Sequence, residues 1–400
     1  MSDTFISDSV LYIGVNDRTL DLFESQYVIP NGVSYNSYVI LDDQIAVMDT
    51  VDSRATEQWF ANLEQALAGE PVSYLVVSHM EPDHAANISR FVEQYPEAKI
   101  VGNSKTFAMI DQFFEVDLTG RKVEVKEGST LELGHHTLQF FMAPMVHWPE
   151  VMVTYEHSEE LLFSADAFGK FGALDTDEGW TEEAARYYLN IVGKYGMQVQ
   201  SLLKKTAALD ISMICPLHGP ILKEDLDYYF GRYQAWSTYQ PEEHGVLVAY
   251  ASIHGNTAEA ARQLAGLLED RGETHVEVLD LSRTDMSLAV RKAFYYDRMV
   301  LAAATYDGGI FPCMEEFLLH LKSKNYQKRT VGLMENGSWA PLANRVMRGL
   351  LESMKEIQVA DTMVTVKSAV HAEAASAMEQ LADELASGRG EQAPSRRQEV

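Results

Sequence analysis

Apolar and polar positions follow different patterns in the two parts of the chain. In the first part, short apolar or alternating runs predict strands, and apolar positions three to four residues apart predict helices. The expected strands are residues 10–15, 34–41, 44–49, 123–132 and 137–143, and the expected helices are residues 56–67, 106–114, 181–195 and 222–239. Strands followed by helices, twice over, are typical of an αββα sandwich.

Strands and helices alternate in the second part of the chain. Strand-like runs lie near residues 246, 276, 298, 330 and 361, with helical patterns between and after them. Five βα units predict a doubly wound, flavodoxin-like parallel sheet. A short polar segment with proline and glycine, residues 240–245, marks the boundary. We therefore expect domains at 1–240 and 246–386, followed by a disordered tail at 387–400 that lacks apolar periodicity.

Composition narrows the class of protein. Hydrophobic residues make up 46% of the 400 positions, enough for two cores, and the net charge of −27 argues against binding to nucleic acid. The two cysteines, Cys215 and Cys313, lie far apart in apolar surroundings, which predicts no disulfide framework and a reducing, cytoplasmic location. The sequence shows no signal-peptide pattern at its start and no apolar stretch that approaches a membrane span.

Seven potential metal ligands follow strand-like runs in the first part. Four of them stand within six residues, directly after the run 73–78, so they can converge only in a tight loop. The seven residues are His79, Glu81, Asp83, His84, His147, Asp166 and His218. Each one alone could be a hydrogen-bonded core histidine, a helix cap or a turn residue. Together, at the ends of strands, they predict a metal site.

The ligand types favour iron. Structural zinc sites prefer thiolate and imidazole, whereas carboxylates mixed with imidazoles suit non-haem iron or manganese. Two ferrous ions would bring four positive charges, and the three carboxylates would offset three of them. The site would then be nearly neutral and could form in a partly buried pocket.

Three loops of the second part predict a planar, phosphorylated cofactor. Each loop follows a strand, precedes a helix and contains glycine; the first offers hydroxyls and amides at a helix N-terminus, and the other two carry aromatic residues. The alternative is three ordinary βα loops, but cofactors of this kind bind at the carboxyl ends of parallel strands. The candidate residues are Ser252, Ile253, His254, Gly255, Asn256, Thr257, Thr305, Tyr306, Asp307, Gly308, Gly309, Asn336, Gly337, Ser338, Trp339 and Ala340.

These motifs carry a family resemblance. The run from His79 to His84, His-x-Glu-x-Asp-His, resembles the metallo-β-lactamase signature, in which hydrolases have histidine at the position of Glu81. With the segments 147–150, 164–168 and 218–220 and the three loops, the chain resembles the flavodiiron proteins (A-type flavoproteins) over about residues 1–386. The resemblance implies a metallo-β-lactamase-like domain with a non-haem di-iron centre, followed by a flavodoxin-like domain with FMN.

The resemblance also implies roles for single residues. It gives one iron the ligands His79, Glu81, His147 and Asp166, and the other iron Asp83, His84, Asp166 and His218, so that Asp166 bridges the two. Tyr195 matches a tyrosine near the irons, with an ordinary core tyrosine as the alternative. We expect Trp148 to pack rather than to react.

The implied activity is reductive. FMN would pass electrons to the di-iron centre, which would reduce nitric oxide to nitrous oxide, dioxygen to water, or both; the sequence does not separate these substrates. No Cys-x-x-Cys pair or dinucleotide fingerprint is present, so we expect no fused rubredoxin module and an external carrier such as rubredoxin. The alternatives are a binuclear zinc hydrolase fused to a flavodoxin-like module and an FMN electron-transfer protein without reductase activity.

Two expectations concern partners. The resemblance, together with a linker of about six residues, predicts a head-to-tail homodimer or a dimer of such dimers. A local basic cluster on this acidic chain could dock the electron carrier near the flavin loops, and a solvated helix end is the alternative. The cluster consists of Lys322, Lys324, Lys328 and Arg329.

Overall fold

The computed structural model describes residues 4–387, which leaves the expected tail beyond residue 387 outside the described part. The chain divides into two compact units, Met1–Thr238 and Tyr239–Val400. Each unit has its own hydrophobic core and is described by itself.

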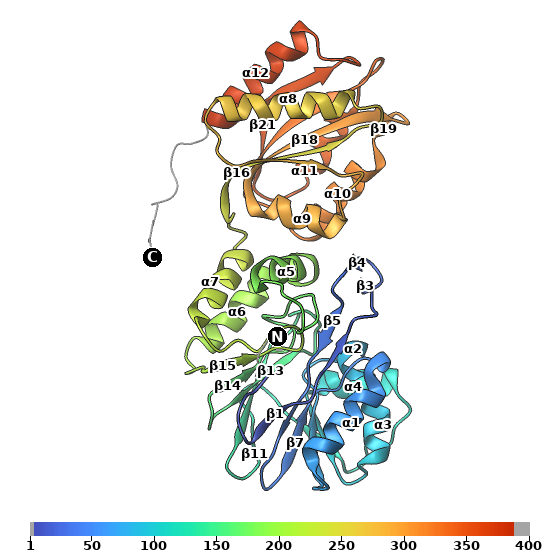
Figure 1. The fold of residues 1–400 in the computed structure, drawn as a ribbon, viewed down its shortest axis with the longest axis vertical. Coiled ribbons are helices and arrows are strands. Elements are labelled where there is room, and N and C mark those ends of the chain that lie inside the picture. The colour runs from blue at the N-terminus through green and yellow to red at the C-terminus, as the bar shows by residue number, and fades with distance from the viewer. Residues whose placement is uncertain (1–3, 388–400) are drawn as a thin grey trace. The chain divides into compact units, whose positions relative to one another are not determined.

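The first unit contains two main sheets that face each other (Figure 1). The first sheet has the order β1 (Val10–Tyr12), β6 (Tyr38–Ile40), β7 (Ile45–Met48), β8 (Val72–Val76), β9 (Lys99–Gly102), β10 (Lys122–Glu124). The second sheet has the order β11 (Thr130–Glu132), β12 (Thr137–Met142), β13 (Met152–Glu156), β14 (Leu161–Phe163), β15 (Met213–Cys215). Two small ribbons pair β2 (Val15–Asp17) with β5 (Val33–Tyr35) and β3 (Leu22–Phe23) with β4 (Tyr27–Val28).

Helices cover the outer faces of both sheets (Figure 1). Those beside the first sheet are α1 (Thr56–Leu67), α2 (Pro82–Ala85), α3 (Ile88–Gln94) and α4 (Ser104–Phe113). Those beside the second are α5 (Trp180–Tyr187), α6 (Gly196–Thr206) and α7 (Leu226–Ser237). Side chains of both sheets, such as Val76 and Phe140, share one buried cluster between them, while Trp59 of α1 packs on the outer face of the first sheet. This confirms the predicted αββα sandwich.

Five predicted elements differ in the structure. The runs 10–15 and 34–41 are each divided between two sheets, the first into β1 and β2 and the second into β5 and β6. The run 123–132 is two strands in different sheets, because the chain turns at Gly128 (φ 75°) between β10 and β11. The helix expected over 181–195 is α5 followed by a π-helical turn and a 3-10 turn (Gly193–Tyr195). Asn190 causes part of this change, because its side-chain amide donates to the carbonyl of Arg186, which an α-helix would use for a backbone bond.

The last difference is the start of α7. The helix expected from residue 222 begins at Leu226, because Leu222 pairs with Ile214 of β15 through two backbone hydrogen bonds of 2.9 and 3.0 Å. Asp225, with φ of 51°, then turns the chain into the helix. The extra pairing extends the second sheet directly after the His218 loop.

The second unit is a parallel sheet with helices on both faces (Figure 1). Its strand order is β17 (Val276–Asp280), β16 (Glu243–Ala251), β18 (Tyr296–Tyr306), β20 (Arg329–Asn336), β21 (Ile357–Val366), and the short β19 (Gly309–Ile310) pairs with the end of β18. The helices are α8 (Asn256–Asp270), α9 (Met286–Tyr295), α10 (Pro312–Ser323), α11 (Ala343–Leu351) and α12 (Ala372–Ser387). The order 2-1-3-4-5 is that of flavodoxin, as predicted.

Candidate metal centre and cofactor pocket

The ends of four strands position the seven candidate ligands. β8 is buried along most of its length and delivers the loop that holds His79, and Pro82 then starts the short helix α2. His147, Asp166 and His218 lie in the loops that follow β12, β14 and β15. Asp166 stands between Ala165 (φ 51°) and Phe168 (φ 67°), two residues in the left-handed region, which is the kind of local strain found at functional sites.

One cluster combines two histidines and two carboxylates. The Nε2 atom of His79 lies 3.3 Å from Glu81 Oε2, 3.2 Å from Asp166 Oδ2 and 3.4 Å from His147 Nε2. His147 Nε2 lies 2.9 Å from the same oxygen of Glu81 and 3.1 Å from Asp166 Oδ2. Metal–ligand bonds of about 2.1 Å at angles of 90–110° would put neighbouring ligand atoms roughly 3.0–3.4 Å apart. The four ligand atoms are therefore spaced for one metal ion.

The second cluster lies on the other side of Asp166. His84 Nε2 is 3.0 Å from His218 Nε2, and Asp83 Oδ2 lies 3.3 Å from His84 and 3.2 Å from His218. The other oxygen of Asp166, Oδ1, is 3.3 Å from His84 and 3.9 Å from His218. Each oxygen of Asp166 thus faces one cluster, which is the geometry of a carboxylate that bridges two metal ions.

The acidic ligands lack the partners that burial requires. Both carboxylate oxygens of Asp83 and of Asp166 are buried without a hydrogen-bond donor among the described residues. Buried carboxylates in this state are costly, and metal ions supply the missing positive charge. The residues therefore fit two metal ions, whose positive charges would offset the carboxylates.

In the metal-free protein, protons on the ligand histidines supply the positive charge that offsets the carboxylates. Burial by itself lowers the pKa of His147, but the adjacent carboxylates of Asp166 and Glu81 outweigh it and raise the pKa to about 9. For Asp166 burial acts in the upward direction, yet the adjacent imidazoles of His79, His147 and His84 hold its pKa well below the usual range. A metal ion must displace these protons in order to bind.

Backbone contacts hold the first ligand loop in place. Asp49, at the end of β7, is buried and accepts the N–H groups of Ser78 at 2.6 Å and His79 at 3.3 Å. The carbonyl of His84 accepts from Thr50 Oγ1 at 2.8 Å. Sequence reasoning missed Asp49 as a support, although a carboxylate directly after a buried strand carries the same signal as the ligands themselves.

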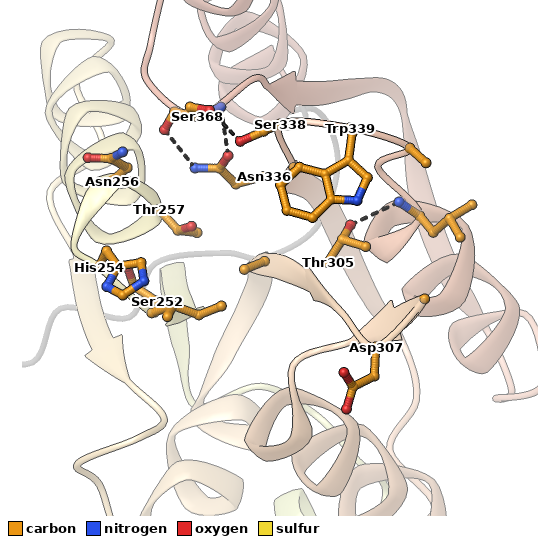
Figure 2. A pocket seen from close by; sticks show the side chains of 16 residues that line it. Ser252, His254, Asn256, Thr257, Thr305, Asp307, Asn336, Ser338, Trp339 and Ser368 are labelled. Carbon is orange, nitrogen blue, oxygen red and sulfur yellow. Dashed lines mark hydrogen bonds between the residues drawn. The ribbon is translucent and has the colours of Figure 1, made fainter.

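A separate cavity of about 430 Å³ opens at the carboxyl ends of the strands in the second unit (Figure 2). Four loops line it, after β16, β18, β20 and β21. The first loop places Ser252, Asn256 and Thr257 at the N-terminus of α8, a helix of 15 residues, with Gly255 at φ 96°. Helix N-termini with hydroxyl and amide donors bind phosphate groups.

The opposite side of the cavity is aromatic. Trp339 is 83% exposed and extends across the cavity beside Thr305, as Figure 2 shows. Thr305 Oγ1 accepts the backbone N–H of Leu342 at 2.9 Å, which fixes the loop that carries the indole. A phosphate-binding end and an exposed flat ring on one cavity suit a flat, phosphorylated heterocycle.

Hydrogen bonds join the third and fourth loops. Asn336 Nδ2 donates to the carbonyl of Ser368 at 3.1 Å, and its Oδ1 accepts the N–H of Ser368 at 3.1 Å (Figure 2). This pair closes the wall of the cavity between β20 and β21.

Comparison with known proteins gives the two units separate matches. Residues 33–219 match the ODP family beta lactamase, and residues 247–372 match a flavodoxin domain. A protein named nitric oxide reductase from Moorella thermoacetica is 28% identical, over 90% of this chain and 92% of its own length. The putative diflavin flavoprotein A 3 from Nostoc sp. is 30% identical over 66% of this chain, but the match spans only 47% of that longer protein.

Solved structures cover both units at once. Rubredoxin oxygen:oxidoreductase from Desulfovibrio gigas matches with a TM-score of 0.90 and 25% identity, over 96% of this chain and 98% of that one. The flavodiiron protein from Giardia intestinalis has the same fold, with a TM-score of 0.90, 22% identity and 97% coverage of both chains. The chain belongs to the flavodiiron protein family. The predicted metallo-β-lactamase-like and flavodoxin-like pair of domains is confirmed.

In this flavodiiron protein, Tyr187 rather than Tyr195 contacts the metal site. The ring of Tyr187 is buried, with its centroid 5.6 Å from that of His218. Tyr195 is half-buried, and its ring lies 5.8 Å from Lys194 Nζ. The π-helical turn after α5 separates the two tyrosines, so the sequence pattern of one long helix could not show which of them faces the ligands. The ring of Trp148 packs edge-on against that of His79, and the two ring centroids are 5.3 Å apart.

The cavity of the flavodiiron protein differs slightly from the predicted loops. Gly255, Tyr306 and Gly309 are not among its lining residues, whereas Leu342 and Ser368 are. Ser368 follows the fifth strand and carries no motif, so its position relative to the third loop is a property of the folded sheet. Tyr306 lies at the start of a tight hairpin that turns at Asp307 and Gly308, both with positive φ.

The predicted carrier-docking cluster is wrong in its placement. Arg329 is 3% exposed and donates to the backbone carbonyls of Phe294, Tyr296 and Tyr239, so it does not contribute to a surface. α10 leads from the cavity end of the sheet to Lys322 in its last turn, about 15 Å away at 1.5 Å per residue. Lys328 directly precedes β20, whose far end reaches the cavity. The lysines therefore lie at the amino ends of the strands, opposite to the cavity.

No helix in residues 4–387 is long and apolar enough to span a membrane.

Proposed function

We propose that this flavodiiron protein is a reductase that uses FMN and two iron ions to reduce nitric oxide to nitrous oxide, dioxygen to water, or both. The observation that carries the proposal is Asp166, whose two oxygens each face a cluster of three further ligands. The names of the Moorella and Desulfovibrio proteins support nitric oxide and dioxygen, respectively, as substrate classes.

The residues of this chain would hold the cofactors and shield the reaction. Two adjacent metal ions, when bound, can hold small substrate molecules side by side and supply electrons to them. Phe23 and Tyr187 pack on His218, with ring centroids 5.3 and 5.6 Å away, and keep bulk water from this side of the site. Burial and the nearby carboxylates raise the pKa of Tyr187 well above its usual value, so its hydroxyl keeps its proton.

The cavity of the second unit supports FMN. Ser252, Asn256 and Thr257 would bind the phosphate at the N-terminus of α8, and Trp339 would stack on the ring system. Electrons would come from an external carrier such as rubredoxin. We further propose the head-to-tail homodimer and the cytoplasmic location; the dimer rests on the family resemblance and the short linker, and the location on the two free cysteines.

A binuclear zinc hydrolase with a flavodoxin-like module is the second candidate. Glu81 disfavours it, because its carboxylate lies among the ligand atoms, 2.9 Å from His147 Nε2, where hydrolases of this fold have a neutral imidazole. An electron-transfer protein without a metal site is disfavoured by the orphaned oxygens of Asp83 and Asp166.

Metal and flavin analysis followed by single turnover tests the proposal. Protein matured with both iron and zinc available should contain about two irons and one FMN per chain. The reduced protein is then mixed anaerobically with nitric oxide or, separately, with dioxygen, and flavin reoxidation and nitrous oxide are measured. Stoichiometric zinc with little iron, or a reduced flavin that neither gas reoxidises, would overturn the reductase assignment.

A further inference from the structure

The ligand histidines His79, His84 and His218 differ in the hydrogen-bond partner of their Nδ1 atom. The Nδ1 atom of His79 donates to Glu150 Oε1 at 2.8 Å. In the other cluster, Nδ1 of His218 donates to the backbone carbonyl of Ser34 at 2.7 Å, and Nδ1 of His84 is buried without a hydrogen-bond partner among the described residues. A carboxylate therefore accepts from the Nδ1 atom of one ligand histidine in the first cluster. In the second cluster, the acceptor found among the described residues is a neutral backbone carbonyl.

Glu150 is built into the protein interior. It is 1% exposed, and its Oε1 also accepts the backbone N–H of Met80 at 2.8 Å. Its other oxygen, Oε2, is buried without a hydrogen-bond donor in the described part of the chain. His79 is the ion-pair partner that the structure gives it. The negative charge of Glu150 therefore acts on the first cluster through the imidazole of His79.

A carboxylate behind a ligand histidine has two effects. It fixes the tautomer and the ring orientation, so that Nε2 faces the metal, and it makes Nε2 a stronger electron donor. The first cluster consequently has Glu81, a share of Asp166 and the charge of Glu150 behind His79. The second has Asp83 and its share of Asp166. Among the carboxylates that are ligands or bond to a ligand side chain, a divalent cation therefore meets one more negative charge at the first position. Asp49 instead accepts from the backbone N–H groups of Ser78 and His79.

We propose that Glu150 is a positioning residue that makes the two metal positions unequal, so that the position of His79, Glu81 and His147 binds a divalent metal ion more tightly and fills first. This inference rests on the proposed metal centre but not on the reaction that it catalyses. It holds for ferrous iron and for zinc alike, because the effect is one of charge and orientation.

Titration of the metal-free full-length protein with ferrous iron tests the inference. The flavin-loaded protein is stripped with a chelator and titrated anaerobically by calorimetry, and Mössbauer spectra are recorded with ⁵⁷Fe at half occupancy. The parent protein should give two dissociation constants and, at half occupancy, one dominant quadrupole doublet. Glu150→Gln keeps an oxygen acceptor but removes the charge, and should weaken the tighter constant by about 10–100-fold. The weaker constant should change by less than about threefold.

Two backgrounds show which position is affected. In His218→Ala the first position remains intact, and addition of Glu150→Gln should weaken its metal binding by the same 10–100-fold. In His147→Ala the second position remains intact, and Glu150→Gln should leave its constant unchanged.

Glu156→Gln is the matched control. Glu156 is also fully buried, and its Oε1 lies 3.0 Å from Nδ1 of a histidine, His136, which is not a metal ligand. Its substitution should leave both constants unchanged, and thermal melting and FMN content report whether any variant has lost its fold. Equal constants in the parent protein, or equal weakening of both positions by Glu150→Gln in a folded protein, would overturn the inference. Absence of gas reduction with two unequal constants would overturn only the proposed reaction.

Discussion

At the scale of single residues, the metal site depends on the chemistry of Glu81 and Asp166. Glu81 supplies a hard, charged oxygen where a hydrolase would supply imidazole, and Asp166 connects two clusters through its two oxygens. Both are buried among histidines whose protonation they control. Metal preference and proton balance are therefore set by the same few atoms.

Exchange of one ligand should change the metal preference. Glu81→His replaces an anionic oxygen by a neutral nitrogen, so we expect the iron-to-zinc ratio to fall severalfold after expression with both metals present. Elemental analysis of the purified protein measures the ratio. Glu57→His, at an exposed acid on α1, is the control and should leave it unchanged. An unchanged ratio together with unchanged activity in Glu81→His would show that Glu81 is not a ligand.

Metal binding should release protons. His147 has a pKa of about 9 in the metal-free protein, and a metal ion binds the neutral imidazole. Below pH 9 a metal ion that binds at the position of His147 must therefore expel at least this proton, so the affinity of that position for ferrous iron should fall about tenfold or more per unit as the pH is lowered from 8.5 to 6.5. Anaerobic calorimetry in two buffers of different ionisation enthalpy counts the protons. A pH-independent affinity over this range would contradict the assignment of His147.

At the scale of elements, the cofactor pocket depends on a helix N-terminus and three further loops. α8 begins at Asn256 directly after the turn at Gly255, and its first-turn residue Thr257 is buried. The remaining loops follow the next strands of a parallel sheet, so all four meet at one edge. The two ends of a bound flavin nucleotide would contact different elements, and binding to each end can be tested separately.

Removal of one hydroxyl should affect the phosphate end alone. Thr257→Val keeps the shape of the side chain but removes a donor at the N-terminus of α8, so we expect the dissociation constant for FMN to rise by about 10–100-fold, as for a hydrogen bond to a charged group. Quenching of flavin fluorescence measures binding. Riboflavin, which lacks the phosphate, serves as the control ligand, and its affinity should stay the same. Equal weakening for FMN and riboflavin would place the phosphate elsewhere.

At the scale of the whole molecule, the chain has two functional regions, and each is built from the loops of a different unit. The metal ligands come from loops of both sheets in the first unit, and the cofactor loops come from one edge of the sheet in the second. Each region is complete within its own unit. Electron transfer between them, in the proposed head-to-tail dimer, would take place between one chain's flavin and its partner's irons.

Mixed dimers should recover activity if this arrangement is correct. Trp339→Ala with Thr257→Val removes flavin contacts, and His79→Ala removes a metal ligand, so neither homodimer should turn over. A mixture refolded or exchanged together should regain up to about a quarter of the parent activity, because half of the dimers are mixed and each has one intact pair of sites. Differently tagged subunits confirm that mixing occurred. Mixed dimers without activity would exclude the cross-chain arrangement.

The sequence determined the class of fold and the identity of most site residues. Buried runs such as Val72–Val76, and the regular alternation after residue 245, specify strands because apolar side chains must leave water. Ligand types also follow from the sequence, since imidazole and carboxylate have fixed metal preferences. The seven residues could be identified because they lie in segments that follow predicted strands, and the structure brings their ligand atoms into two clusters.

Only the tertiary structure decided which residues support the site and how they face each other. After Tyr187 the helix continues as a π-helical turn and a 3-10 turn, and Tyr187, not Tyr195, lies beside His218. Glu150 and Asp49 act through contacts with residues 71 and 29–30 positions away, so the sequence does not show which groups their carboxylates hold. Local propensity acts over a few residues, whereas the partners of a buried charge are set by packing between sheets.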